Sequence, residues 1–196
     1  MTEIYLATED ELSEAVAERL VMDSNKKLRV AVRMGRHGNG YLKRKLPELM
    51  QVASSFPVLM LTDLDRIECP PALIAEWSSG RSLPPAMLFR VAVREVEAWL
   101  LADREAFAAF VGAPLNKIPL NPDSLDDPKQ TLLGFVRRYG RREIKADILP
   151  KSGSRCTVGL GYNQRLCRFV TELWEPERAT TCSDSLARAF ERLRNL

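Results

Sequence analysis

Apolar and amphipathic stretches alternate along the first 110 residues of the chain. Short apolar or β-branched runs predict four strands, at residues 3–7, 28–32, 56–62 and 87–92. Helical spacing of apolar residues predicts a first helix that begins at about residue 9, and further helices at 41–54, near Trp77 and at 93–110. Strands separated by helices need crossover connections. The pattern therefore predicts an α/β fold with a mostly parallel four-stranded sheet flanked by helices.

The pattern changes after about residue 112. Residues 112–127 are rich in proline and show no clear periodicity, and a glycine-containing loop follows near 151–161. Three further helices are expected, at 128–142, 163–174 and 183–196, the last capped by Ser183 or Asp184. We therefore expect an α/β domain at residues 1–111 and a basic, mainly helical C-terminal extension at residues 112–196.

Acidic residues follow three of the four predicted strands. Glu9 comes after the first strand, Asp63 and Asp65 come after the third, and Glu97 lies in the helix after the fourth. Ligands of parallel α/β sheets bind at the carboxyl ends of the strands, so these side chains can meet at one edge. Each also has a plain structural alternative, because aspartates serve turns and acidic residues cap helices.

Glu97 lies within the apolar stripe of its predicted helix. It falls between Val93 and Leu101 on a helical wheel, so its carboxylate is expected to be buried. A buried carboxylate is costly unless a cation compensates it. The partner is either a metal ion or an arginine, with Arg90 and Arg94 as the candidates. Carboxylate oxygens favour magnesium, manganese or calcium over zinc or copper.

The basic residues are unequally divided along the chain. The net charge is +3, but residues 1–110 hold 14 basic and 16 acidic residues, whereas residues 111–196 hold 15 and 10. A basic half suits a polyanion such as nucleic acid, although a solvated helix face gives the same pattern. The candidates for phosphate contacts are Lys43, Arg44, Arg66, Arg94, Lys129, Arg137, Arg138, Arg141 and Arg142.

Several classes of protein are disfavoured by what the chain lacks. His37 is the only histidine and no nucleophile signature accompanies it, which argues against Ser-His-Asp or Cys-His catalysis. The four cysteines form no CxxC pair. No stretch approaches the roughly 18 apolar residues of a membrane span, and the N-terminus is acidic where a signal peptide is basic. We therefore expect a cytoplasmic protein with no membrane partner.

The acidic motifs resemble those of the TOPRIM domain over residues 3–110. The resemblance consists of an acidic residue after the first strand, a glycine-bearing loop after the second, Asp63-Leu-Asp65 after the third, and the run Arg94-Glu-Val-Glu97-Ala-Trp-Leu-Leu101. That run is most similar to stand-alone TOPRIM proteins related to OLD-family nucleases, many of which belong to bacterial anti-phage or mobile-element systems. The resemblance implies a Rossmann-like fold.

The resemblance also implies roles for the acidic residues. Glu9 would be a metal ligand or general acid/base, Asp63 and Asp65 the central ligands, and Glu97 the ligand that completes a second site. Asp10 stands where the family commonly has glycine, and could be an additional ligand. The implied activity is hydrolysis of DNA or RNA phosphodiesters with Mg²⁺ or Mn²⁺, in phage defence, with Arg66 or Arg94 stabilising transition-state charge.

Three other functions fit the same residues. A non-catalytic TOPRIM module could bind nucleic acid or a nucleotide, as the partner of an ATPase encoded nearby. An effector or interaction subunit could hold a structural cation and bind an acidic protein through its basic tail. A primase-like nucleotidyltransferase would be unusually short, because the chain leaves little room for accessory domains. One fold hosts many activities, so the fold does not choose among them.

Overall fold

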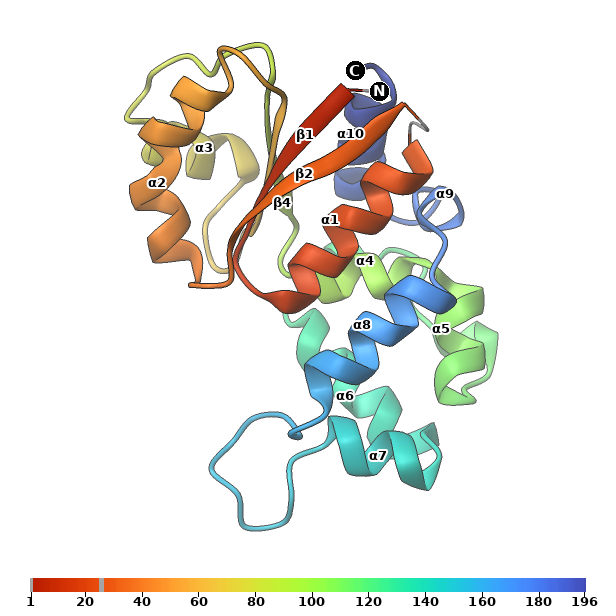
Figure 1. Cartoon of the computed structure of the whole chain (residues 1–196). Helices are drawn as coiled ribbons and strands as arrows, with labels where there is room; N and C mark the ends of the chain where they lie inside the picture. The colour runs from red at the N-terminus through yellow and green to blue at the C-terminus, as the bar shows by residue number, and fades with distance from the viewer. Residues whose placement is uncertain (1, 25–26) are drawn as a thin grey trace.

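The computed structural model describes residues 2–24 and 27–196 of the 196-residue chain, and is built on a four-stranded sheet (Figure 1). The strands are β1 (Thr2–Thr8), β2 (Leu28–Gly35), β3 (Val58–Asp63) and β4 (Met87–Ala92), in the order β2-β1-β3-β4. All neighbouring strands are parallel, which confirms the predicted α/β class. The arrangement is consistent with a Rossmann-like TOPRIM fold.

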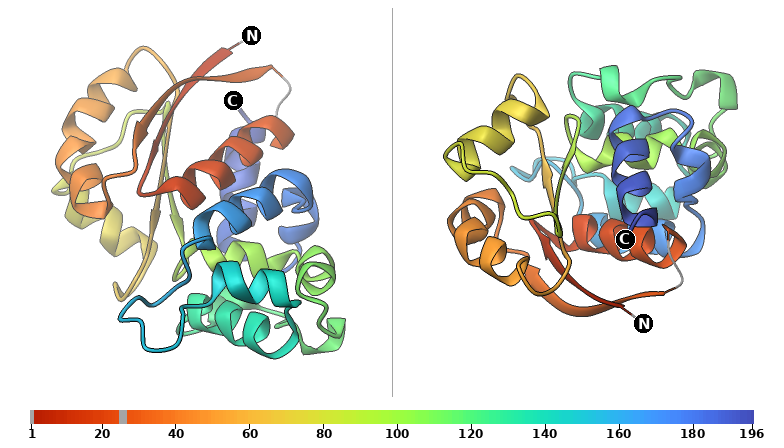
Figure 2. Two further views of the ribbon diagram at one scale, coloured as in Figure 1. Left: turned by 60° about the horizontal axis from the view of Figure 1, so that its bottom comes forward. Right: turned by 90° about the horizontal axis from the view of Figure 1, so that it is seen from above.

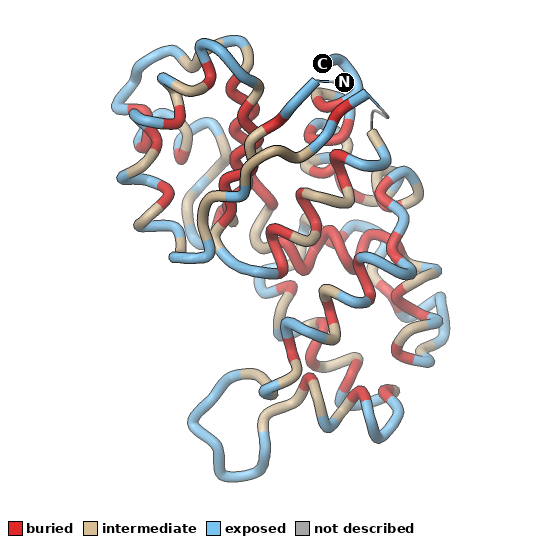
Figure 3. The backbone as a smooth tube through the Cα atoms, in the orientation of Figure 1, coloured by how far each residue is buried: buried red, intermediate tan, exposed pale blue. Residues whose placement is uncertain are grey.

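Helices cover both faces of the sheet. They are α1 (Glu11–Ser24) and α4 (Val96–Ala102) on one face, and α2 (Asn39–Val52) and α3 (Pro70–Ser78) on the other. Figure 2 shows the two layers from two further directions. The central strand β3 is buried along nearly its whole length (Figure 3), as its uninterrupted apolar sequence predicted.

The second half of the chain packs on the α1 face. Its elements are α5 (Arg104–Val111), the 3-10 turns η1 (Leu115–Lys117) and η2 (Pro122–Ser124), α6 (Pro128–Tyr139), α7 (Arg142–Ile148), α8 (Tyr162–Glu172), α9 (Pro176–Ala179) and α10 (Asp184–Arg194). One apolar core runs from Ile4 and Leu12 through Trp99 to Phe169 and Leu193. The expected division after residue 111 stays a prediction, but this core crosses it.

Two predicted helices are each interrupted. The helix predicted at 93–110 is α4 and α5, separated by Asp103, whose side chain accepts a hydrogen bond from Ala106 N and starts a new helix. The helix predicted at 128–142 is α6 and α7, separated at Gly140. A Cβ at Gly140 would lie 2.6 Å from the Val136 carbonyl oxygen, so only glycine permits the bend.

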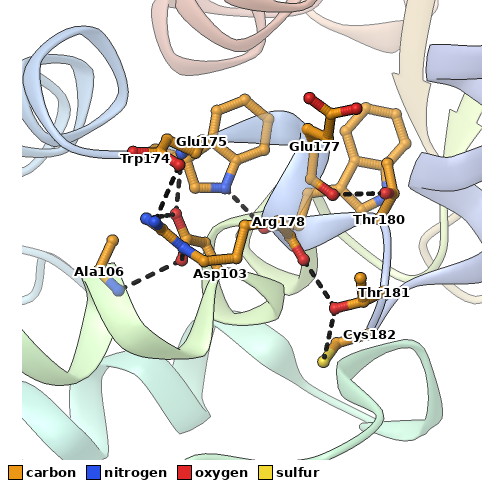
Figure 4. A network of polar contacts seen from close by, with 10 residues as sticks. Asp103, Ala106, Trp174, Glu175, Glu177, Arg178, Thr180, Thr181 and Cys182 are labelled. Atoms are coloured by element: carbon orange, nitrogen blue, oxygen red, sulfur yellow. Dashed lines mark hydrogen bonds and ion pairs between the residues drawn. The ribbon is translucent and has the colours of Figure 1, made fainter.

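Asp103 also joins the α4–α5 corner to the segment around α9 (Figure 4). It is fully buried, accepts a hydrogen bond from Glu175 N at 2.8 Å, and pairs with Arg178 at 2.6 and 2.7 Å. Next to it, Trp174 Nε1 donates to the Trp99 carbonyl at 3.0 Å. These contacts hold the segment around α9 against α4, the helix that carries Glu97.

The segment between α7 and α8 extends away from the body of the molecule (Figures 1 and 3). Residues 151–157 are all exposed, including Lys151 and Arg155. The base of this loop is tightly packed, because Gly161 N donates to the Asp147 carbonyl and a Cβ at Gly159 would lie 2.2 Å from that same oxygen. In the described part of the chain, no helix is long and apolar enough to cross a membrane.

Replacing Asp103 with alanine is expected to lower the free energy of unfolding by about 3 kcal/mol, because it removes a helix cap and strands the Arg178 guanidinium. Chemical denaturation followed by circular dichroism measures the change. Glu172→Ala is the control, since it breaks an exposed pair with Arg168 and should cost no more than about 0.5 kcal/mol. Equal losses in the two variants would contradict the role given to Asp103.

Candidate functional site

Glu9 reaches from the end of β1 across to the end of β3. Its Oε1 accepts a hydrogen bond from Asp63 N at 3.0 Å and a second one from the Thr62 hydroxyl. Burial raises the pKa of Glu9, and these two hydrogen bonds oppose that rise. The side chain is therefore held at the carboxyl edge of the sheet, as the sequence predicted, and does not cap α1.

Asp63 lies at the end of β3, between the strand and the start of α4. Its Oδ1 accepts a hydrogen bond from Val96 N, the first residue of α4, at 2.9 Å. Burial holds the pKa of Asp63 well above its usual value, and the negative charges of Glu97, Glu9, Asp10 and Asp65 raise it further. The four predicted ligands thus influence one another, with Asp63 at their centre.

Asp65 is exposed and lies in the left-handed backbone region, with φ of 50°. Its N–H donates to the Arg94 carbonyl at 2.9 Å, and Arg94 Nη1 donates back to the carbonyls of Asp65 and Ile67 at 3.1 and 2.9 Å. Arg94 therefore holds the Asp63–Asp65 turn in a conformation that a non-glycine residue rarely adopts.

The glycine-rich segment after β2 donates hydrogen bonds to two of the acidic residues. Gly38 N donates to the Glu9 carbonyl at 3.0 Å, and Asn39 Nδ2 donates to Asp65 Oδ2 at 3.3 Å. Glycine is required at position 35, because φ is 136° and a Cβ would lie 1.9 Å from the Thr8 carbonyl oxygen. These contacts join the segment after β2 to the turn that carries Asp65.

Glu97 is buried in α4, with 2% of its surface exposed, as the helical wheel predicted. Its Oε1 accepts a hydrogen bond from the Tyr162 hydroxyl at 2.7 Å and lies 3.3 Å from Lys129 Nζ. Its Oε2 is buried and has no hydrogen-bond partner. The arginines proposed from the sequence as ion-pair partners are not the ones used, because Arg94 bonds to backbone carbonyls and the Glu97 ion pair is with Lys129.

Lys129 and Tyr162 come from the second half of the chain. Lys129 N donates to Glu95 Oε2 at 2.9 Å, which places the start of α6 beside α4. Burial lowers the pKa of Lys129, but the charges of Glu97 and Glu95 outweigh it and leave that pKa raised. Burial and the Glu97 charge raise the pKa of Tyr162. Sequence reasoning proposed Lys129 for phosphate binding, but missed Tyr162, which carries no charge and follows an irregular loop.

Asp10 has a structural role that is visible in the fold. Its Oδ1 accepts a hydrogen bond from Ser13 N at 2.8 Å and its carbonyl accepts from Glu14 N, so it caps α1. Its charge still reaches the cluster, because it raises the pKa of Glu9 and of Asp63. The idea that Asp10 is a further metal ligand stays a prediction.

The other basic candidates lie outside this cluster of contacts. Lys43 pairs with Glu76 at 2.5 Å, and Arg44 and Arg66 are exposed. The four basic residues at the end of α6 and the start of α7 are also exposed: Arg137, Arg138, Arg141 and Arg142. Arg137 is eight residues from Lys129, about 12 Å along the helix axis. A nucleic-acid strand bound at the carboxylates would need to extend along α6 to reach these four arginines.

The donor chemistry of the cluster fits a hard divalent cation. Every predicted ligand offers carboxylate oxygens, and Glu97 Oε2 is a buried acceptor without a hydrogen-bond donor. Within residues 2–24 and 27–196, however, no three His, Cys, Asp or Glu side chains are already positioned to hold a metal ion. Binding would therefore need side-chain adjustment, most easily at the exposed Asp65.

Comparisons with known proteins give one structural likeness. No family model and no curated protein matches the chain. Among solved structures, the chain is similar to one described as the C-terminal region of the Burkholderia pseudomallei OLD protein, with a TM-score of 0.44 and 13% identity. The alignment covers 98% of this chain and 97% of that one.

Asp63→Asn is expected to raise the free energy of unfolding at pH 7 in EDTA. The folded pKa of Asp63 is raised, so the folded state binds protons more tightly, and stability falls as pH rises from the unfolded pKa through the folded one. Asparagine removes this cost and keeps an oxygen that can accept from Val96 N.

Urea denaturation of both proteins between pH 4 and pH 8 measures the effect. The difference in stability between Asp63→Asn and the parent should grow as pH rises. The exposed Asp126→Asn serves as the control and should show no such trend. A variant that is less stable than the parent at pH 7 would show that the Asp63 charge is already compensated.

Proposed function

We propose that this chain is a divalent-metal-dependent nuclease that hydrolyses phosphodiester bonds of DNA or RNA. The observation that carries the proposal is the Glu97 carboxylate, buried among the charges of three other acids with one oxygen fully engaged and the other unpartnered. A buried carboxylate oxygen without a hydrogen-bond donor lowers the stability of the fold. Clusters of buried acids occur mainly at functional sites.

Glu9, Asp63, Asp65 and Glu97 would hold Mg²⁺ or Mn²⁺ through their carboxylate oxygens. When bound, such ions supply charge stabilisation for a phosphodiester and an activated water. On Glu97, Tyr162 and Lys129 both engage Oε1, which leaves Oε2 for the cation. Glu9 is oriented by Thr62 and Asp63, so it could accept a proton at a defined position.

Lys129 supplies the cationic side of the site. Its ammonium lies 3.3 Å from Glu97 Oε1 and 3.9 Å from Glu95 Oε1, and it is partly exposed. A phosphate oxygen that approaches the carboxylates would therefore meet this ammonium. Arg66 is exposed beside Asp65 and free to serve the same purpose, whereas Arg94 acts on the backbone of the turn. The exposed arginines of α6 and α7 are proposed to follow the nucleic-acid backbone.

A non-catalytic module that binds nucleic acid or a nucleotide is the second candidate. Two observations favour it: the described residues hold no ready-made group of three metal ligands, and Lys129 already pairs with Glu97. Such a module would act with a partner, for which an ATPase encoded nearby is the proposal. Participation in phage defence stays a prediction that rests on the family resemblance.

We expect purified protein to cut fluorescently labelled nucleic acid with Mg²⁺ or Mn²⁺ and to leave it intact in EDTA. Single- and double-stranded DNA and RNA are compared on denaturing gels. Asp65→Ala and Glu97→Gln should reduce the cleavage rate at least about 100-fold, as expected when a group that supports metal-ion catalysis is lost. The exposed Asp126→Asn is the control and should cut at the parental rate.

Binding without cutting would favour the second candidate. In that case, affinity for labelled oligonucleotides should fall steeply with added salt, because released counterions drive the association. Glu97→Gln should then leave the affinity within about twofold. Cleavage that continues unchanged in both Asp65→Ala and Glu97→Gln would exclude the carboxylate site as its origin.

A further inference from the structure

A cavity with apolar walls and two arginines lies at the β4 edge of the sheet. Strand β4 is last in the sheet order, and a cavity of about 270 Å³ lies against it, between α3 and the start of α10. Apolar walls come from one face of β4, with Phe89 and Val91, and from Ile74 of α3. Two arginines also line the cavity, Arg90 from β4 and Arg188 from α10. None of these residues belongs to the carboxylate site.

Arg90 is a half-buried cation without a counter-charge. Its Nε is buried and has no hydrogen-bond partner, and within the described residues no ion pair reaches its guanidinium. Burial lowers the pKa of Arg90, and the neighbouring positive charge of Arg192 lowers it further. Arg192 itself donates to the Pro85 carbonyl at 2.8 Å. A buried guanidinium nitrogen with no acceptor is costly, so an anion supplied from solution would compensate it.

The acidic residues of the cavity do not supply that anion. Asp123 accepts hydrogen bonds from the Ser183 hydroxyl at 2.7 Å and from Ser185 N at 2.9 Å, so both of its oxygens are engaged at the start of α10. Asp184 is exposed. Arg188 is exposed too and, in the part of the chain described by the structure, makes no ion pair or hydrogen bond. Two guanidinium groups are thus left to bind a ligand.

The size and chemistry of the cavity define the ligand class. Its volume is at the low end for ligand pockets, which suits a small molecule. Arginine forks favour oxyanions, and a tetrahedral phosphate can accept from two guanidinium groups that come from different elements. We propose that this cavity binds the phosphate group of a small ligand, with Arg90 and Arg188 donating to its oxygens. The site does not depend on the proposed nuclease activity.

Isothermal titration calorimetry on the full chain in EDTA, with sodium phosphate and with adenosine monophosphate, tests this proposal. The parent protein should bind phosphate, and Arg90→Met and Arg188→Gln should each weaken binding at least about tenfold. Arg168→Gln changes an exposed arginine of α8 and should bind like the parent. Tighter binding of adenosine monophosphate than of phosphate would identify a nucleotide as the source of the group, whereas equal binding would identify free phosphate.

Thermal unfolding separates a binding role from a structural one. Phosphate should raise the unfolding midpoint of the parent protein and leave that of Arg90→Met unchanged. Without phosphate, Arg90→Met should unfold at the parental temperature or above, because it removes an unpartnered half-buried cation. If millimolar phosphate does not bind to the parent, or binds equally to Arg188→Gln and the parent, the proposal is overturned. These readings hold whether or not the chain cleaves nucleic acid.

Discussion

Mutual repulsion among carboxylates at one end of a parallel sheet is the constraint that shapes this protein. Asp63 lies between Glu9 and Glu97 and is enclosed by the core, so its negative charge is unfavourable without compensation. The chain holds these groups together with directed donors. Val96 N bonds to Asp63, Asp63 N bonds to Glu9, and Tyr162 with Lys129 bonds to Glu97. These contacts orient the acids but leave Glu97 Oε2 unpartnered.

The second half of the chain is needed for this arrangement. Lys129 begins α6 and Tyr162 begins α8, and both elements pack on the core that lies under α1 and α4. The Asp103–Arg178 network then fixes the end of the chain to the corner after α4. The basic half therefore takes part in the site itself, in addition to offering an exposed surface of arginines. This explains why one apolar core crosses the predicted boundary near residue 111.

The sheet and the position of its acidic edge could be predicted from the sequence, because both depend on local patterns. Period-two and apolar runs defined the strands, and parallel connections place every strand end on one edge. The wheel position of Glu97 was enough to predict its burial. The same local reasoning predicted a single helix at 93–110, because the apolar pattern continues past Asp103, the residue that caps α5 and also binds Arg178 and Glu175.

Long-range partners were the part that sequence reasoning missed. Nearby arginines were considered for Glu97, but the fold brings in Lys129 and Tyr162, which are 32 and 65 residues away in the chain. Likewise, the bond from Asn39 to Asp65 joins the first residue of α2 to the turn after β3. Such pairs form because helices pack around a shared core, and the periodicity of the sequence does not predict them.

Location of Mn²⁺ by anomalous X-ray scattering from crystals grown with manganese would test the central claim directly. The account predicts an anomalous peak within bonding distance of Asp63, Asp65 and Glu97, with Glu97 Oε2 among the ligands. The peak should be lost in crystals of Asp63→Asn. A well-ordered carboxylate cluster without any peak at millimolar manganese, with Lys129 still paired to Glu97, would contradict it.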